Sequence, residues 1–168
     1  MKVTDKHVFF WRSAFSNWHI SPFVAEIEGK KLEFTTSEQY FMYVKAITFK
    51  DYEIAERILK EGTSPRIAKD LGRLVKNYDD KVWDEKRYQV MLDANILKFT
   101  QHKESRDILL NPKFDGKHFV EANKYDKIWA IGIGENEALD DKSNWNGRNL
   151  LGQVLDEVRA YLLKEKNI

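Results

Sequence analysis

The sequence contains no cysteine, and this absence excludes several kinds of chemistry. Without thiols the chain can form no disulfide framework, no zinc–thiolate site and no cysteine nucleophile. The histidines also lack the close spacing of a metal-binding pair. We therefore expect neither a metal nor another cofactor. The four histidines in question are His7, His19, His102 and His118.

An excess of charge of one sign is also lacking, because 28 Lys and Arg residues stand against 27 Asp and Glu residues. A protein whose main task is to grip nucleic-acid phosphates carries a marked positive excess. The balance argues against such a protein. It leaves open a local basic patch, and with it a nucleic-acid substrate.

Long hydrophobic runs are absent as well. No stretch approaches the ~20 apolar residues that span a bilayer, and the N-terminal segment MKVTDKHVFFW lacks the features of a signal peptide. We expect no membrane partner and a cytoplasmic location. The 168 residues, 42% of them hydrophobic, suit one domain with a real core.

The hydrophobic periodicity predicts an α+β fold, a single compact, helix-rich domain with a small β-sheet. Alternating residues predict a strand over 7–11 and a hairpin around Gly29 over 23–34. Thr35 and Glu38 predict a capping box, and residues 118–134 return to strand and loop. The predicted helices cover residues 35–50, 51–60, a run opening at 64–65, and residues 79–100, 105–110 and 150–164.

The helix over residues 36–49 carries charges among its apolar residues. At about 100° per residue, Glu38 and Lys45 share a side with Phe41 and Phe49. Burying an isolated charge is costly, so such groups are paired or face a polar site. Two interpretations stay open: a structural ion pair or surface residues, and a pocket in which a desolvated lysine acts as a nucleophile.

The segment FFWRSAFSNWHISPF, residues 9–23, mixes aromatic rings with polar groups. It predicts either a core strand that runs into a turn or a ligand-binding loop. In a loop, an aromatic ring would stack on a base, the amide would read a polar edge, and the guanidinium would meet a phosphate. The candidate ligand contacts are Phe10, Arg12, Ser16, Asn17 and Trp18.

Two acids, Glu121 and Asp126, interrupt the apolar segment FVEANKYDKIWAIGIG, residues 119–134. They form either a solvated loop edge or a group that faces a ligand. The WAIGIG run lacks a dinucleotide fingerprint and predicts a buried strand ending at a turn. Before the last helix, Asn149 is a candidate N-cap, and the helix start beside Arg148 is a candidate anion site.

Taken in order, these motifs resemble those of the NADAR family, also called YbiA-like. The series runs FW, SNW, SEQYFMYVKA, KDLGR, KF-x-Q, VEAN-x-x-D-x-IW and WNGRNLLGQVLDEVR, over about residues 8–163. The resemblance implies one NADAR domain over residues 1–168, with a helix-rich α+β fold. It also implies N-glycosidase chemistry, the hydrolysis of the bond between ribose C1 and a base nitrogen.

The resemblance implies two substrate classes. The favoured one is ADP-ribose attached to a nucleobase, notably guanine in nucleic acid, where the enzyme reverses an ADP-ribosylation. The other is the set of ribosylamino-pyrimidine phosphates of the early riboflavin pathway. An alternative from another class is a non-catalytic sensor, which would bind ADP-ribose or a nucleotide and release no product.

Four catalytic residues are carried over from the family pattern. Glu38 and Lys45 match the acid and lysine of the E-Q-Y-F-x-x-x-K helix, and Glu121 and Asp126 match the late acidic segment. One acid would stabilise the cationic ribose or activate water, and the other would hold a hydroxyl or move a proton. Lys45 would either form a Schiff base with C1 of the opened sugar or contact a phosphate or hydroxyl.

The expected substrate contacts follow from the same pattern. Asn17 and Trp18 match an early turn, Trp129 the late aromatic position, and Asn149 with Gly152 the final N-x-L-G. The family pattern W-G-x-G becomes Trp129-Ala130-Ile131-Gly132 here, so Ala130 adds a methyl group where the backbone was expected to approach the ligand. The candidate phosphate contacts are Arg12, Arg73 and Arg148.

Overall fold

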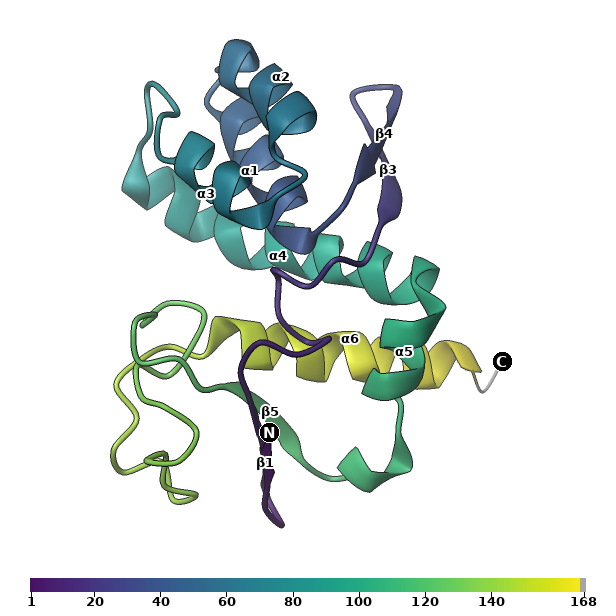
Figure 1. The fold of residues 1–168 in the computed structure, drawn as a ribbon, viewed down its shortest axis with the longest axis vertical. Helices are drawn as coiled ribbons and strands as arrows, with labels where there is room; N and C mark the ends of the chain where they lie inside the picture. Colours follow the sequence, from purple (N-terminus) through teal and green to yellow (C-terminus); the bar gives the residue numbers. More distant parts are fainter. Residues whose placement is uncertain (167–168) are drawn as a thin grey trace. The chain divides into compact units, whose positions relative to one another are not determined.

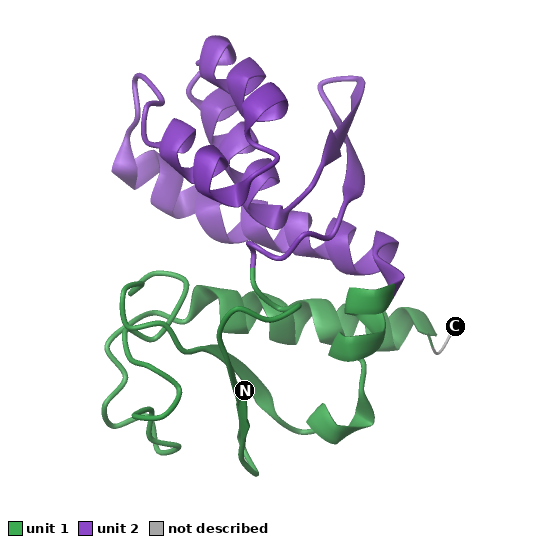
Figure 2. Cartoon of the chain, viewed as in Figure 1, with its two compact units in different colours: residues 1–16, 104–168 green, residues 17–103 purple. Residues whose placement is uncertain are grey.

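The contacts of the chain group into two compact units in the computed structural model, which describes residues 1–166 (Figure 2). Unit 1 is discontinuous and combines residues 1–16 with the chain from Glu104 onward, whereas unit 2 is the continuous segment Asn17–Lys103. The prediction of one domain over residues 1–168 stays a prediction.

Unit 1 contains a three-stranded sheet in the order β1-β2-β5. The strands are β1 (Lys2–Val3), β2 (His7–Phe10) and β5 (His118–Glu121). β1 and β2 are antiparallel, while β2 and β5 run parallel, from His7 opposite His118 to Phe10 opposite Glu121. The strand predicted over residues 7–11 is confirmed over residues 7–10, where it is the central strand of the sheet and every residue is buried.

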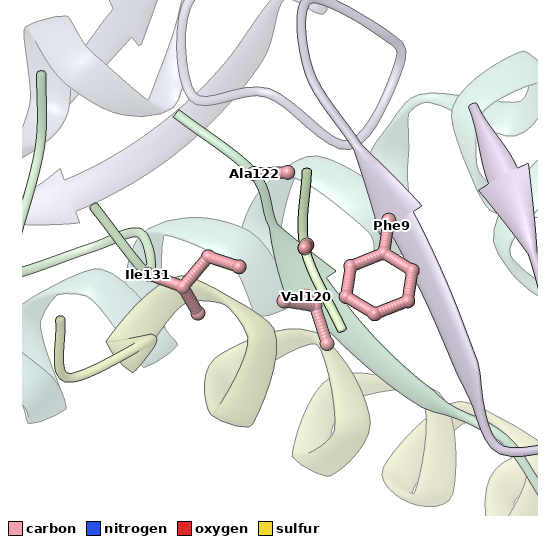
Figure 3. Close-up of a cluster of buried hydrophobic side chains, with 5 residues drawn as sticks. Phe9, Val120, Ala122 and Ile131 are labelled. Atoms are coloured by element: carbon pink, nitrogen blue, oxygen red, sulfur yellow. The ribbon is translucent and has the colours of Figure 1, made fainter. Parts of the chain in front are cut away.

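The helices of unit 1 follow the second part of its chain (Figure 1). They are α5 (Lys103–Leu109), which starts at the last residue of unit 2, a 3₁₀ turn (Pro112–Phe114) and α6 (Leu150–Lys166). α6 packs against β5. A buried apolar cluster lies at the sheet, and Figure 3 shows its members Phe9, Val120, Ala122 and Ile131.

Residues 122–149 join β5 to α6 without a regular strand or helix, so the predicted buried strand over WAIGIG is wrong. The backbone of Ile131 makes isolated hydrogen bonds to two different segments. Its N–H donates to the Glu121 carbonyl at 3.0 Å, and its carbonyl accepts the Asn146 N–H at 2.7 Å. Gly132, with φ +71°, ends any extended conformation.

Unit 2 begins with a two-stranded hairpin of β3 (Phe23–Ile27) and β4 (Lys30–Phe34). Its turn residues Glu28 and Gly29 have φ of 50° and 77°, the signs that a tight two-residue hairpin turn requires. The helices are α1 (Ser37–Thr48), α2 (Tyr52–Glu61), α3 (Pro65–Gly72) and α4 (Asp80–Gln101).

In unit 2, α1 contacts α2, α3 and α4, and β3 contacts α4 (Figure 1). A side chain added at Gly72 would collide with Met42, so Gly72 permits the close packing of α3 against α1. Together the elements of the two units confirm the predicted α+β, helix-rich class with small sheets. None of the helices within residues 1–166 has both the length and the apolar character needed to cross a bilayer.

The predicted capping box at Thr35 and Glu38 is displaced by one residue. The N-cap of α1 is Thr36, whose hydroxyl accepts the N–H of Gln39 at 3.1 Å. The Gln39 side chain then reaches back and accepts the Thr35 N–H at 2.8 Å. Thr35 and Thr36 are each followed three residues later by Glu or Gln, so both fit the capping-box pattern and the sequence does not distinguish between them.

Candidate functional site

The predicted acid and lysine of unit 2 both lie on α1. Glu38 is in the first turn and is 7% exposed, and its N–H donates to the Asn17 carbonyl at 3.1 Å. Lys45 is half-buried in the last turn, with Nζ 4.5 Å from the centre of the Tyr78 ring. A rigid helix therefore holds both groups.

Lys45 has a lowered pKa. Burial is the main cause, and the positive charges of Arg87 and Arg73 act in the same direction. Glu38 and Asp80 oppose the shift through their negative charges. Because the pKa is lowered, more of the Lys45 amine is neutral near pH 7 than in a free lysine, which is the requirement for a lysine nucleophile.

The Asn17 side chain is committed to the interior of unit 2. It is 6% exposed, and its Oδ1 accepts a hydrogen bond from Asn95 Nδ2 at 3.2 Å. The Asn17 carbonyl also accepts the Glu38 N–H, so Asn17 links the start of α1 to Asn95 on α4. The structure thus gives Asn17 a positioning role, and its contact with a ligand stays a prediction.

Sequence reasoning missed two buried polar residues on α4. Arg87, 7% exposed, makes ion pairs with Asp80 at 3.4 Å and Asp84 at 3.2 Å, and Asn95 is fully buried. Both lie at four-residue intervals from Met91 along the helix. Polar residues at the spacing of the buried stripe were the available signal.

Lys98 is also on α4, is fully buried, and has its pKa lowered to about 7 by that burial. An unfolded lysine keeps a value near 10.5. Between these values the unfolded chain binds more protons, so the free energy of unfolding should rise with pH by up to about 1.4 kcal/mol per pH unit. Lys98→Met should remove this rise, which urea unfolding measured between about pH 7 and 9.5 would show.

The matched control for Lys98 is Lys86→Met, which removes an exposed lysine from the same helix. It should leave the pH dependence of stability as in the wild type. An unchanged slope in Lys98→Met would contradict the assignment of that slope to Lys98.

In unit 1 the acid Glu121 closes β5 and is half-buried. Its N–H donates to Asn149 Oδ1 at 3.1 Å, and Asn149 Nδ2 donates to the Phe119 carbonyl at 3.1 Å. The Asn149 amide therefore bonds to the edge of β5 as a neighbouring strand would. Asn149 precedes α6 with φ +51°, and its carbonyl accepts the Gln153 N–H at 3.2 Å, so it occupies the predicted N-cap position. Its side chain, however, holds β5 instead of capping the helix.

Gly152 makes this arrangement possible. A Cβ at Gly152 would collide with the Phe119 carbonyl oxygen and with the Asn149 side chain. We expect Gly152→Ala to destabilise the protein by about 1–3 kcal/mol, the usual range for overpacking, measured by urea unfolding. In Gly134→Ala the new methyl group would meet the end of the Glu137 side chain, which can move. That control should be nearly neutral, and an equally neutral Gly152→Ala would contradict the expectation.

Asp126 has a turn-forming role. Its Oδ1 accepts the N–H groups of Ile128 and Trp129, both at 2.9 Å, and the Gly132 N–H donates to its carbonyl at 3.0 Å. Its catalytic role stays a prediction. The Ala130 residue is 0% exposed, so its methyl group lies inside the protein.

The other predicted contacts differ in exposure. Phe10 is 0% exposed and packs 5.4 Å from the Phe15 ring centre, so its ring belongs to the core of unit 1. Trp18 is 43% exposed in unit 2. Arg12 has φ +51° and lies over the Trp11 ring at 4.2 Å. Ser16 and Trp129 are partly exposed, and Arg148 is exposed.

The structure therefore collects the candidates in two groups. Glu38 and Lys45, with Asn17 behind them, belong to unit 2, whereas Glu121 and Asp126 belong to unit 1. A separate groove of about 980 Å³ in unit 2 is lined by the hairpin, α1 and α2, but by none of the predicted site residues. Within residues 1–166, no three His, Asp or Glu side chains converge as metal ligands would.

Comparison with known proteins adds a family and several relatives. Residues 9–163 match the family model described as NADAR domain. Protein irg-1 of Caenorhabditis elegans is 42% identical over 95% of this chain and 81% of its own length. N-glycosidase R617 of Acanthamoeba polyphaga mimivirus is 35% identical, over 93% of this chain and 96% of its own.

A solved structure is similar as well. The NMR structure of the Escherichia coli protein YbiA superposes with a TM-score of 0.74 at 30% identity, covering 98% of this chain and 89% of that one. The protein named N-glycosidase YbiA from Escherichia coli strain K12 is 32% identical over 90% of this chain and 82% of its own length.

Proposed function

Because this chain belongs to the NADAR domain family, we propose that it releases ADP-ribose from guanine in nucleic acid by hydrolysing the bond between ribose C1 and the base nitrogen. Relatives named N-glycosidases, which align with this chain over most of both lengths, support hydrolysis of an N-glycosidic bond.

The observation that carries the mechanism is the partial burial of the Lys45 amine on α1, which lowers its pKa. In the proposed reaction the sugar ring opens as the C1–O4 bond breaks, and a proton goes to O4. The neutral Lys45 amine adds to C1, and the base nitrogen leaves with a proton. Water then hydrolyses the Schiff base, which restores the amine and gives the free aldehyde, and ring closure completes the ADP-ribose product.

The two acids of unit 1 keep the roles that the family resemblance implies. Positive charge develops at C1 as its bond to the base weakens, and a nearby carboxylate stabilises that charge or activates the water. We assign this role to Glu121, because the Asn149 side-chain amide bonds to the β5 backbone and fixes the end of the strand that carries Glu121. Asp126 would hold a ribose hydroxyl or move a proton, through the carboxylate oxygen that does not bind the turn amides.

The test is a mass-spectrometric turnover panel with three substrates: a guanine-ADP-ribosylated oligonucleotide, a ribosylamino-pyrimidine phosphate and NAD. Release of ADP-ribose from the oligonucleotide is the expected result. Cleavage of the pyrimidine compound alone would replace the proposed substrate by a metabolite. Binding of ADP-ribose without any product would support a sensor and overturn the catalytic roles.

A further inference from the structure

Tyr125 has the largest exposed fraction, 81%, among the exposed large hydrophobic side chains within residues 1–166. A single exposed aromatic ring is ordinary on a protein surface, so its surroundings decide whether it has a role. Tyr125 lies in the loop after β5, between the two acids Glu121 and Asp126. A role in substrate binding would therefore place the ring beside the proposed chemistry.

The backbone on both sides of the ring is anchored within unit 1. Asn123 Oδ1 accepts the N–H of Tyr125 itself at 2.9 Å. Asp126 closes the following turn, and the Arg148 N–H donates to the Lys127 carbonyl at 2.8 Å. The ring is thus displayed from a loop whose conformation is already set, which lowers the entropy lost when a ligand covers it.

Positive charge lies beside the ring. Lys124 Nζ lies 5.0 Å from the Tyr125 ring centre, and Lys127, two residues further along the same loop, is exposed. The intervening carboxylate is directed at least in part toward the turn amides, since Oδ1 accepts two of them. Exposed aromatic rings together with cationic side chains bind single-stranded nucleic acid, because bases stack on the rings and phosphates meet the lysines.

We propose that Tyr125, Lys124 and Lys127 form a binding surface for a single-stranded polynucleotide. Tyr125 stacks on an unpaired base next to the modified guanine, and the lysines contact phosphates of the strand. The inference deepens the proposed function, on which it rests for the identity of the modified base. A free nucleotide offers no neighbouring base, so this surface favours a polynucleotide over a free ADP-ribosyl compound.

Fluorescence anisotropy with labelled, unmodified single-stranded DNA and RNA tests the surface without requiring turnover. Base stacking on an aromatic ring is worth about 1–3 kcal/mol, which corresponds to roughly 5- to 150-fold in affinity. We expect Tyr125→Ala to raise Kd by that factor and Tyr125→Phe to bind as the wild type does. Replacing both lysines by alanine should reduce the slope of log K against log salt by about 1.4.

Tyr161→Ala is the matched control, because Tyr161 is 43% exposed in the same unit. It lies roughly 15 Å along α6 from the end that bonds to the 128–130 segment. Its Kd should equal that of the wild type. Binding of DNA only or RNA only would support the surface and identify the sugar, whereas equal Kd values for Tyr125→Ala and the wild type on both strands would overturn it.

The two proposals fail separately. Tyr125-dependent binding of the unmodified strands together with no product in the turnover panel would leave the surface standing and reject the glycosidase substrate. Release of ADP-ribose together with equal strand binding by the wild type and Tyr125→Ala would support the glycosidase substrate and reject the surface.

Discussion

Glu121→Gln should lower kcat on the cleaved substrate by about 10²–10⁴-fold, the usual contribution of a positioned acid or base. Glutamine keeps the shape of the side chain but cannot carry the negative charge that the developing cation at C1 requires. The bonds from the Glu121 N–H to Asn149 Oδ1 and from the Ile131 N–H to the Glu121 carbonyl do not involve the replaced carboxylate. The fold should therefore survive the change.

The measurement is kcat from product release, followed by mass spectrometry, with urea unfolding as the check on the fold. Glu165→Gln, which changes an exposed acid on α6, is the control and should match the wild type. A Glu121→Gln variant that retains near-normal kcat would remove the residue from the mechanism. If Glu121→Gln unfolds, the same measurement on Glu121→Asp, which keeps the negative charge, separates the loss of fold from the loss of catalysis.

Lys45→Arg should abolish Schiff-base formation, because a guanidinium stays protonated at any pH at which the protein is folded. The expected loss is at least about 10³-fold in kcat, since the covalent route closes while the positive charge remains. A lysine that only contacted a phosphate or hydroxyl would be replaced by arginine at a much smaller loss. This variant therefore separates the two roles that the sequence leaves open.

The pH profile supplies an independent reading. The nucleophile is the neutral amine, so kcat should rise with pH through the lowered pKa of Lys45 and level off above it. Borohydride added during turnover should trap a covalent adduct in the wild type and in the control Lys60→Arg, where an exposed lysine of α2 is changed. Full turnover with no trapped adduct would rule out the covalent role.

Much of the fold could be predicted because local patterns agree with it. The hairpin around Gly29 and the run of helices from residue 37 to residue 101 follow from turn residues, caps and periodicity. The loop over residues 122–149 could not be predicted, because its conformation depends on bonds to distant backbone such as Ile131 N–H to Glu121 O. Sequence periodicity carries no information about such partners.

The site shows the same division. The charges of Glu38 and Lys45 on a largely apolar helix were visible in the sequence, and both lie at least half-buried on α1. The role of Asn149 was not visible, since an asparagine before a helix satisfies the rules for an N-cap. Only the position of β5 shows that its amide bonds the strand instead. Arg87, which contributes to the lowered pKa of Lys45, was missed although its spacing from Met91 marks it as part of the buried stripe.

The discontinuity of unit 1 sets an order of events during synthesis. The buried strand β2 pairs with β5, but the whole of unit 2, residues 17–103, is translated between them. Unit 2 is built from contacts between neighbouring elements and can form while the ribosome is still working. Until β5 has been synthesised, the apolar residues of β2 and the strand edge that later pairs with β5 remain without their partner. We therefore expect nascent chains that stop short of β5 to be bound by chaperones through the first sixteen residues.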